Sequence, residues 1–143
     1  MNVAFFLTLR KDVACVKDTS TVRQGLETMR GNRYTAVPVV TDENKYVGTV
    51  SEGDFLWYIV KCQTENGELE QMSIKNLEKV MIRDIIRPDK NPPVPITATI
   101  EELLTRSMRQ NFIPVVDDRG SLVGIVTRKT IIKYCCENHI LVK

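Results

Sequence analysis

The side chains best placed for chemistry in this sequence are Ser51 and Asp54, a hydroxyl and a carboxylate three residues apart. Ser51 ends an apolar, strand-like segment, and Asp54 falls in the first turn of the helix expected after it. A carboxylate there can accept hydrogen bonds from both hydroxyls of a ribose, and such charge-assisted bonds contribute roughly 1.5–3 kcal/mol. Free N–H groups at the helix N-terminus add donors for a phosphate or hydroxyl. The same pair also fits a helix cap, and the two roles are compatible.

A second cluster lies 76 residues further on, at Thr127, Arg128, Lys129 and Thr130. Thr130 stands where Asp54 stands in the first cluster, and a threonine does not hold a diol as an anion does. We therefore expect an anionic acceptor site at Asp54 and none at Thr130. The two neighbouring cations fit either a phosphate or a solvated basic pair at a helix start.

Both clusters belong to an internal repeat. Residues 35–40 and 46–51 align with residues 111–116 and 122–127 at one offset, and the proline, glycine and hydroxyl positions coincide without a gap. Each copy reads as a short strand, a helix behind a hydroxyl cap, two strands joined by a polar turn, and a closing helix. The sequence therefore predicts an α/β (α+β) fold built from two βαββα units.

We place the first repeat at residues 1–62, a polar linker at 63–72, and the second repeat with a leading helix at 73–143. Ser73 is expected to cap the leading helix, whose apolar side would hold Ile74, Leu77, Val80 and Met81. The first strands are expected at residues 13–16 and 94–96. One unit of about 60 residues would expose too much of its sheet, so two units are expected to pack face to face with pseudo-two-fold symmetry.

The pattern resembles the cystathionine-β-synthase (CBS) domain, present as a tandem pair called a Bateman module. The family motif is a hydrophobic-Pro-Val strand, then Gly, a hydrophobic residue, Ser or Thr, and an Asp that begins a helix. The first copy has Val37-Pro38-Val39 and then Gly48-Thr49-Val50-Ser51-Glu52-Gly53-Asp54. The second has Ile113-Pro114-Val115 and then Gly124-Ile125-Val126-Thr127-Arg128-Lys129-Thr130, which departs from the motif at its last residue.

This resemblance implies a regulatory module, with no catalytic cofactor, that senses AMP, ADP or ATP and signals its state to a separate partner protein. Cyclic di-AMP and S-adenosylmethionine are alternative ligands, and a dimerisation module without a ligand is a further alternative. The resemblance places the ribose on Asp54, the phosphate near Arg128 and Lys129, and the base near Ala36. The implied contacts of the first cleft are Asp12, Val13, Thr35, Ala36, Val37, Pro38, Ser51, Asp54, Thr127, Arg128 and Lys129. Those of a weaker second cleft are Val94, Phe112, Ile113, Pro114 and Thr130.

The closing helix of the first copy carries Phe55-Leu56-Trp57-Tyr58, of which half must face outward. Exposed aromatic groups of this kind mark interfaces. CBS modules commonly pair through these helices, so we expect a homodimer.

The amino-acid composition excludes several classes of protein. The chain has 143 residues, 27% of them charged and 43% hydrophobic, which indicates a soluble globular protein and excludes a disordered or collagen-like chain. The net charge of +2, without a helix-turn-helix or a basic aromatic stripe, argues against nucleic acid. No apolar run approaches the roughly 20 residues that cross a bilayer, so we expect no membrane contact and a cytoplasmic location.

Catalytic and metal chemistry is not indicated either. The sequence has no P-loop, no Rossmann glycine series and no activated nucleophile, so we expect a binding module and not an enzyme. Its four cysteines lack a CxxC spacing and its single histidine, His139, is near the C-terminus, which predicts reduced thiols and no metal site.

Overall fold

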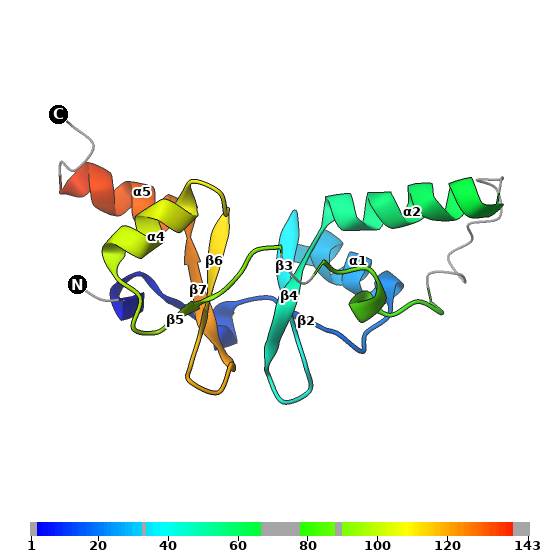
Figure 1. The fold of residues 1–143 in the computed structure, drawn as a ribbon, viewed down its shortest axis with the longest axis horizontal. Coiled ribbons are helices and arrows are strands. Elements are labelled where there is room, and N and C mark those ends of the chain that lie inside the picture. The colour runs from blue at the N-terminus through cyan, green and yellow to red at the C-terminus, as the bar shows by residue number, and fades with distance from the viewer. Residues whose placement is uncertain (1–2, 33, 67–77, 88–89, 139–143) are drawn as a thin grey trace. The chain divides into compact units, whose positions relative to one another are not determined.

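The computed structural model describes residues 3–32, 34–66, 78–87 and 90–138, which are drawn in colour in Figure 1. The contacts divide the chain into two compact units. We call Ala14–Lys90 the Asp54 unit, and Met1–Val13 together with Asn91–Lys143 the Thr130 unit. Among the described residues, no helix is both long and apolar enough to cross a membrane.

The Asp54 unit has a three-stranded sheet in the order β2-β3-β4, with β2 parallel to β3 and β3 antiparallel to β4. Both long helices of the unit lie on the same side of this sheet in Figure 1. Its elements are β2 (Val16–Lys17), α1 (Val22–Asn32), β3 (Ala36–Val40), β4 (Tyr46–Ser51), α2 (Glu52–Asn66) and the 3-10 helix η4 (Ile82–Asp84).

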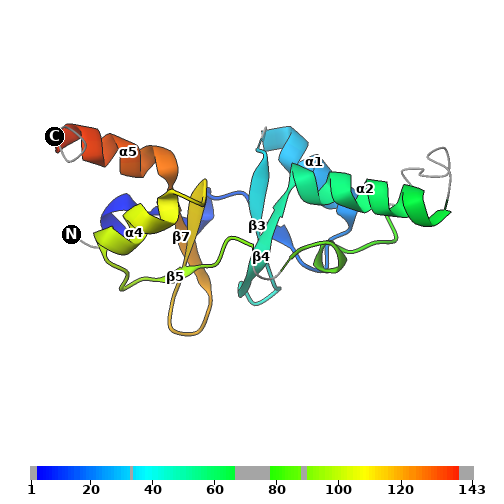
Figure 2. The same ribbon diagram turned by 45° about the horizontal axis from the view of Figure 1, so that its top comes forward.

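The Thr130 unit repeats this plan and adds one strand from the beginning of the chain. Its sheet has the order β1-β7-β6-β5, and α4 and α5 lie together on one side of it in the turned view of Figure 2. Its elements are η1 (Val3–Phe6), β1 (Thr8–Leu9), η2 (Arg10–Asp12), β5 (Val94–Pro95), α4 (Ile100–Ser107), β6 (Phe112–Val116), β7 (Leu122–Thr127) and α5 (Arg128–Glu137). The predicted α+β class with two βαββα units is confirmed.

Threonines start the first helix of each unit. The Thr21 hydroxyl accepts a hydrogen bond from the Gln24 N–H at 3.2 Å, and the Gln24 side chain accepts one from the Thr21 N–H at 2.9 Å. Thr99 caps α4 by accepting from the Glu102 N–H at 3.2 Å. These bonds satisfy N–H groups that have no partner inside the helix, so they fix where α1 and α4 begin.

The segment after α2 returns to close the core of the Asp54 unit. Ile82 is fully buried, its N–H donates to the Ser20 carbonyl at 2.8 Å, and the Val22 N–H donates to the Val80 carbonyl at 2.8 Å. Its side chain packs with apolar residues from both helices and the sheet: Val16, Val22, Met29, Val37, Val39, Val50 and Phe55. Burial of apolar surface on this scale supplies most of the stability of a small unit.

A corresponding core in the Thr130 unit depends on the N-terminal segment. Val3 and Phe6 of η1 are buried against α4, α5 and the sheet, and Phe6 lies edge-on to Tyr134 with ring centroids 5.0 Å apart. β1 then pairs antiparallel with β7, Thr8 opposite Ile125 and Leu9 opposite Gly124. The compact units therefore do not follow the boundaries of the two repeats, because the described residues 3–13 pack with the second repeat.

Where the structure describes the middle of the chain, α2 overlaps the expected linker and the expected conformation of Val80 and Met81 is wrong. α2 continues through Asn66, so the first four residues of the expected 63–72 linker are helical. Val80 and Met81, expected in a leading helix, are not helical: Val80 lies in a bend, and Met81 is extended and forms an antiparallel bridge with Thr21. Ser73, Ile74 and Leu77 of that expected helix lie outside the described residues.

The expected first strands are shorter in the structure. In the first strand only Val16 and Lys17 pair with β3, opposite Val39 and Val40, so residues 13–15 of the expected strand lie outside it. The chain turns towards the cap of α1 directly after Lys17. The strand expected at residues 94–96 likewise ends at Pro95.

Substitution of Gly124 tests the close approach of β1, the strand from the N-terminal segment, to β7. A Cβ at this position would lie 2.1 Å from the Thr8 carbonyl oxygen, so Gly124→Ala should force β1 from β7 and lower the free energy of unfolding by about 2–3 kcal/mol. Gly31→Ala is the matched control, because a Cβ there meets nothing within 4 Å and alanine favours the helix. Urea denaturation measures both; equal stability of Gly124→Ala and the parent would contradict the tight approach.

Candidate functional site

The candidate site lies where β4 ends and α2 begins. Ser51 is the last residue of β4 and pairs with Ala36 across the hairpin. The Glu52 N–H donates to the Thr35 carbonyl at 3.0 Å and ties the first turn of α2 to the start of β3. Asp54 follows in that turn, and its side chain is only 2% exposed. The structure thus brings together four of the predicted site residues, Thr35, Ala36, Ser51 and Asp54.

Ser51 supplies two donors to the buried carboxylate. Its backbone N–H donates to Asp54 Oδ2 at 2.8 Å, and its hydroxyl donates to the same oxygen at 3.0 Å. The expected proximity of hydroxyl and carboxylate is therefore present. Because both bonds involve residues of the strand–helix junction, they hold the carboxylate in one orientation.

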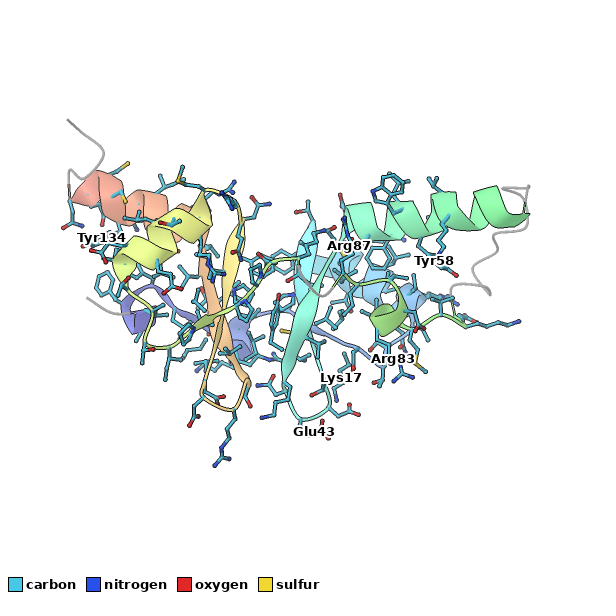
Figure 3. The ribbon with its side chains drawn as sticks, viewed as in Figure 1. Lys17, Glu43, Tyr58, Arg83, Arg87 and Tyr134 are labelled. Carbon is cyan, nitrogen blue, oxygen red and sulfur yellow. The ribbon has the colours of Figure 1, made fainter. Side chains whose placement is uncertain are left out.

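Two cations that the sequence reasoning missed complete the site. Lys90 Nζ donates to Asp54 Oδ2 at 3.1 Å and also to the Ser51 hydroxyl oxygen, while Arg87 donates to Asp54 Oδ1 at 3.3 Å. Both follow η4, which packs against the core of the unit, and Figure 3 shows Arg87 near the start of α2. The basic excess of the second half of the chain was the available signal for them.

The pKa of Asp54 reflects opposing effects. Burial is the largest of them and raises the pKa, but hydrogen bonds from Ser51 and Lys90, and the positive charge of Lys90, together hold it below the ordinary value of 3.8. Asp54 is therefore an anion at neutral pH, able to accept hydrogen bonds and unable to donate them.

The equivalent junction of the Thr130 unit has the same backbone and different chemistry. The Arg128 N–H donates to the Asn111 carbonyl at 2.9 Å, the counterpart of the Glu52–Thr35 bond. The hydroxyls of Thr127 and Thr130 lie 2.8 Å apart, and the Thr130 N–H donates to Thr127 Oγ1 at 3.3 Å. This junction therefore presents a pair of hydroxyls in place of an anion.

Arg128 is already engaged within its own unit. Its Nε donates to the Ser107 carbonyl, near the end of α4, at 2.8 Å. Lys129, next to it, is exposed. The structure therefore gives Arg128 an anchoring contact that the sequence did not predict.

The remaining predicted residues are mostly packing positions. Val37 and Pro38 are buried in the sheet of the Asp54 unit, and Asp12 and Val13 belong to the Thr130 unit. In the predicted second cleft, Val94, Ile113 and Pro114 are buried and Phe112 is half-buried.

The ionised state of Asp54 generates a pH test. Because the folded pKa is depressed, the stabilisation by the carboxylate is complete above the unfolded pKa and is lost as pH falls through the folded pKa. Asp54→Asn should lower stability by about 1–3 kcal/mol at neutral pH, and this difference should shrink in acid. Urea denaturation of both proteins at about pH 7 and about pH 3 measures it.

Asp42→Asn is the control, because Asp42 also pairs with a lysine, Lys17 at 3.1 Å, but both side chains are largely exposed. An exposed pair of this kind contributes about 0–1 kcal/mol. If Asp54→Asn were destabilised equally at the two pH values, the ionised carboxylate would not be the stabilising species.

Comparison with known proteins identifies the scaffold. The family model described as CBS domain matches residues 7–61 and 77–137. CBS domain-containing protein CBSX1, chloroplastic, of Arabidopsis thaliana is 30% identical over 150 aligned positions, 92% of this chain and 63% of that protein. The chain thus spans less than two thirds of that relative.

Two solved structures carry nucleotides. CbpB in complex with c-di-AMP has a TM-score of 0.81 at 28% identity, covering 99% of this chain and 87% of that one. CBSX2 in complex with AMP has a TM-score of 0.74 at 25% identity, covering 96% and 98%. Two matches of the family model, over most of the sequence, show that the chain belongs to the CBS domain family and carries the domain as a tandem pair.

Proposed function

We propose that the chain is a regulatory module that binds an adenine nucleotide at the Asp54 site and signals the bound state to a separate protein. The crystallised relatives CBSX2, with AMP, and CbpB, with c-di-AMP, support the ligand class. Catalysis has no role in this proposal, and no catalytic cofactor is required. The cytoplasmic location and the lack of nucleic-acid and membrane partners stay predictions from the sequence.

The observation that carries the proposal is the buried, ionised Asp54 carboxylate beside a hydroxyl and two cations. A ribose offers two adjacent hydroxyl donors, and a carboxylate offers two oxygens at matching separation. A nucleotide also carries phosphate, which arginine and lysine bind well. Ala36 lies opposite Ser51 in the hairpin, so backbone groups near it are available to the base.

The geometry favours a mononucleotide over cyclic di-AMP. In cyclic di-AMP each 3′ oxygen is part of a phosphodiester, so each ribose has one free hydroxyl and no vicinal diol. AMP, ADP and ATP keep both hydroxyls, which is what a two-oxygen acceptor recognises. The similarity to CbpB makes cyclic di-AMP the second candidate.

The assignments of phosphate contacts to Arg128 and Lys129, and of base contacts to Asp12, Val13 and Thr35, stay predictions. We also propose one strong site per chain, because Thr127 and Thr130 present two hydroxyls where the first repeat presents Ser51 and Asp54. The weaker second cleft remains a proposal.

The affinity test replaces Asp54 and removes one hydroxyl from the ligand. Asp54→Ala should weaken AMP by roughly 2–3 kcal/mol, about 30- to 150-fold in Kd, because it removes two charge-assisted hydrogen bonds. 2′-Deoxy-AMP should bind the parent protein more weakly than AMP, and the two should bind Asp54→Ala equally. Isothermal titration calorimetry gives Kd and a stoichiometry of one.

Thr130→Ala is the matched control, at the equivalent position of the other unit, and should leave the strong site unchanged. The ribose assignment is wrong if Asp54→Ala binds AMP as tightly as the parent. Tighter binding of cyclic di-AMP than of AMP would favour the second candidate.

We further propose a homodimer formed through α2. Leu56, Trp57 and Val60 are exposed by 61%, 67% and 40%, while Phe55 on the same helix is buried. Three large apolar side chains within one and a half turns make a patch that water disfavours and a second copy can cover.

Trp57→Glu tests this association. Light scattering should give about twice 16.3 kDa for the parent and the monomer mass for Trp57→Glu, because the carboxylate would be buried unpaired in the interface. Ile96→Glu, another exposed apolar position beyond β5, should remain dimeric. A monomeric parent at micromolar concentration, with AMP present, would refute the dimer.

A further inference from the structure

The acceptor capacity of Asp54 is almost fully used before any ligand arrives. A carboxylate has about four lone-pair sites, and four hydrogen bonds reach this one. Oδ2 accepts from the Ser51 N–H, the Ser51 hydroxyl and Lys90, and Oδ1 accepts from Arg87. A ribose diol that donates to Asp54 must therefore replace donors that are already present.

The backbone donor and the two cations differ in how readily they can leave. The Ser51 N–H is fixed in the backbone at the end of β4, next to the Glu52–Thr35 hydrogen bond. Lys90 and Arg87 end long side chains that are 33% and 63% exposed, so each has solvent beside it and a flexible stem. The cations are the donors that an incoming diol replaces.

Whether a cation displaced from Asp54 finds a new anionic partner depends on the ligand. Displacing Lys90 from a buried carboxylate breaks an ion pair, and a neutral nucleoside brings no anion to replace that carboxylate. A nucleotide brings its phosphate, to which a displaced ammonium or guanidinium group can donate. A nucleotide can therefore give the displaced cation a new anionic partner, its phosphate, whereas a nucleoside cannot.

We propose that Lys90, assisted by Arg87, is the resident counterion of Asp54 and selects nucleotides against nucleosides by moving from the carboxylate to the phosphate. This inference rests on the proposed binding of adenine nucleotides, and it assigns the selectivity to two residues of the Asp54 unit. It makes phosphate recognition a property of that unit, in addition to any contact from Arg128.

The experiment measures Kd for AMP and for adenosine with the parent, Lys90→Met and Arg87→Met. Lys90→Met removes both the competitor for Asp54 and the phosphate partner. AMP should bind about tenfold more weakly, while adenosine should bind no more weakly than to the parent. Arg87→Met should shift the ratio of the two constants in the same direction by a smaller factor, because Arg87 is more exposed and its contact is longer. Lys90→Arg retains the charge and should keep most of the preference for AMP.

Lys17→Met is the matched control, since Lys17 also pairs with an aspartate, Asp42. Lys17 lies opposite Val40 near the turn of the β3–β4 hairpin, as Figure 3 shows, and Ser51 lies at the other end of that hairpin. Its replacement should leave both Kd values unchanged.

Weaker binding of AMP to Lys90→Met, without weaker binding of adenosine, supports the inference, because a purely structural role would weaken both together. Equal changes for AMP and adenosine, or none, would overturn it while leaving the proposed function intact. If the parent protein binds neither AMP nor adenosine, the proposed mononucleotide binding at Asp54 fails, and the selection mechanism fails with it.

Discussion

A carboxylate removed from water must regain its hydrogen bonds inside the protein, and the Asp54 unit is arranged around that requirement. The donors to Asp54 come from the end of β4 and from the segment that follows η4. Burial of Ile82 holds that second segment against the core. The apolar core and the polar site are thus linked. Ile82 is buried in the core, and the segment that follows it carries Arg87 and Lys90, which pair with Asp54.

The two units share the same backbone arrangement at the strand–helix junction but carry different side chains there. Both have the same hairpin register and the same hydrogen bond from the first helical N–H to the preceding strand. Ser51 and Asp54 give the first junction a charge that must be compensated, whereas Thr127 and Thr130 satisfy each other at 2.8 Å. A neutral pair of hydroxyls needs no counterion, so the second junction does not require cations as the first does.

Much of the fold could be predicted because local patterns determine it. The four long strands, both hairpin turns and the helix after each hairpin have their own apolar periodicity and turn residues, and Ser51 and Asp54 are close in sequence. Arg87 and Lys90 could not be assigned to the site, since they lie 33 and 36 residues from Asp54 and only tertiary packing brings them there. The apolar spacing predicted a helix that includes Val80 and Met81. This prediction was wrong because the pairing of Met81 with Thr21 outweighs a weak helical preference.

The pairing of β1 with β7 has a consequence for the order of folding. Thr8 and Ile125 are more than a hundred residues apart, yet they are neighbours in one sheet. During synthesis, residues 1–13 emerge long before their partner strand exists, so Val3 and Phe6 must stay uncovered until β7 is made. The Asp54 unit, whose segments are contiguous, can form meanwhile. Closing so long a loop is slow, which makes the pairing of the earliest strand a late step in folding.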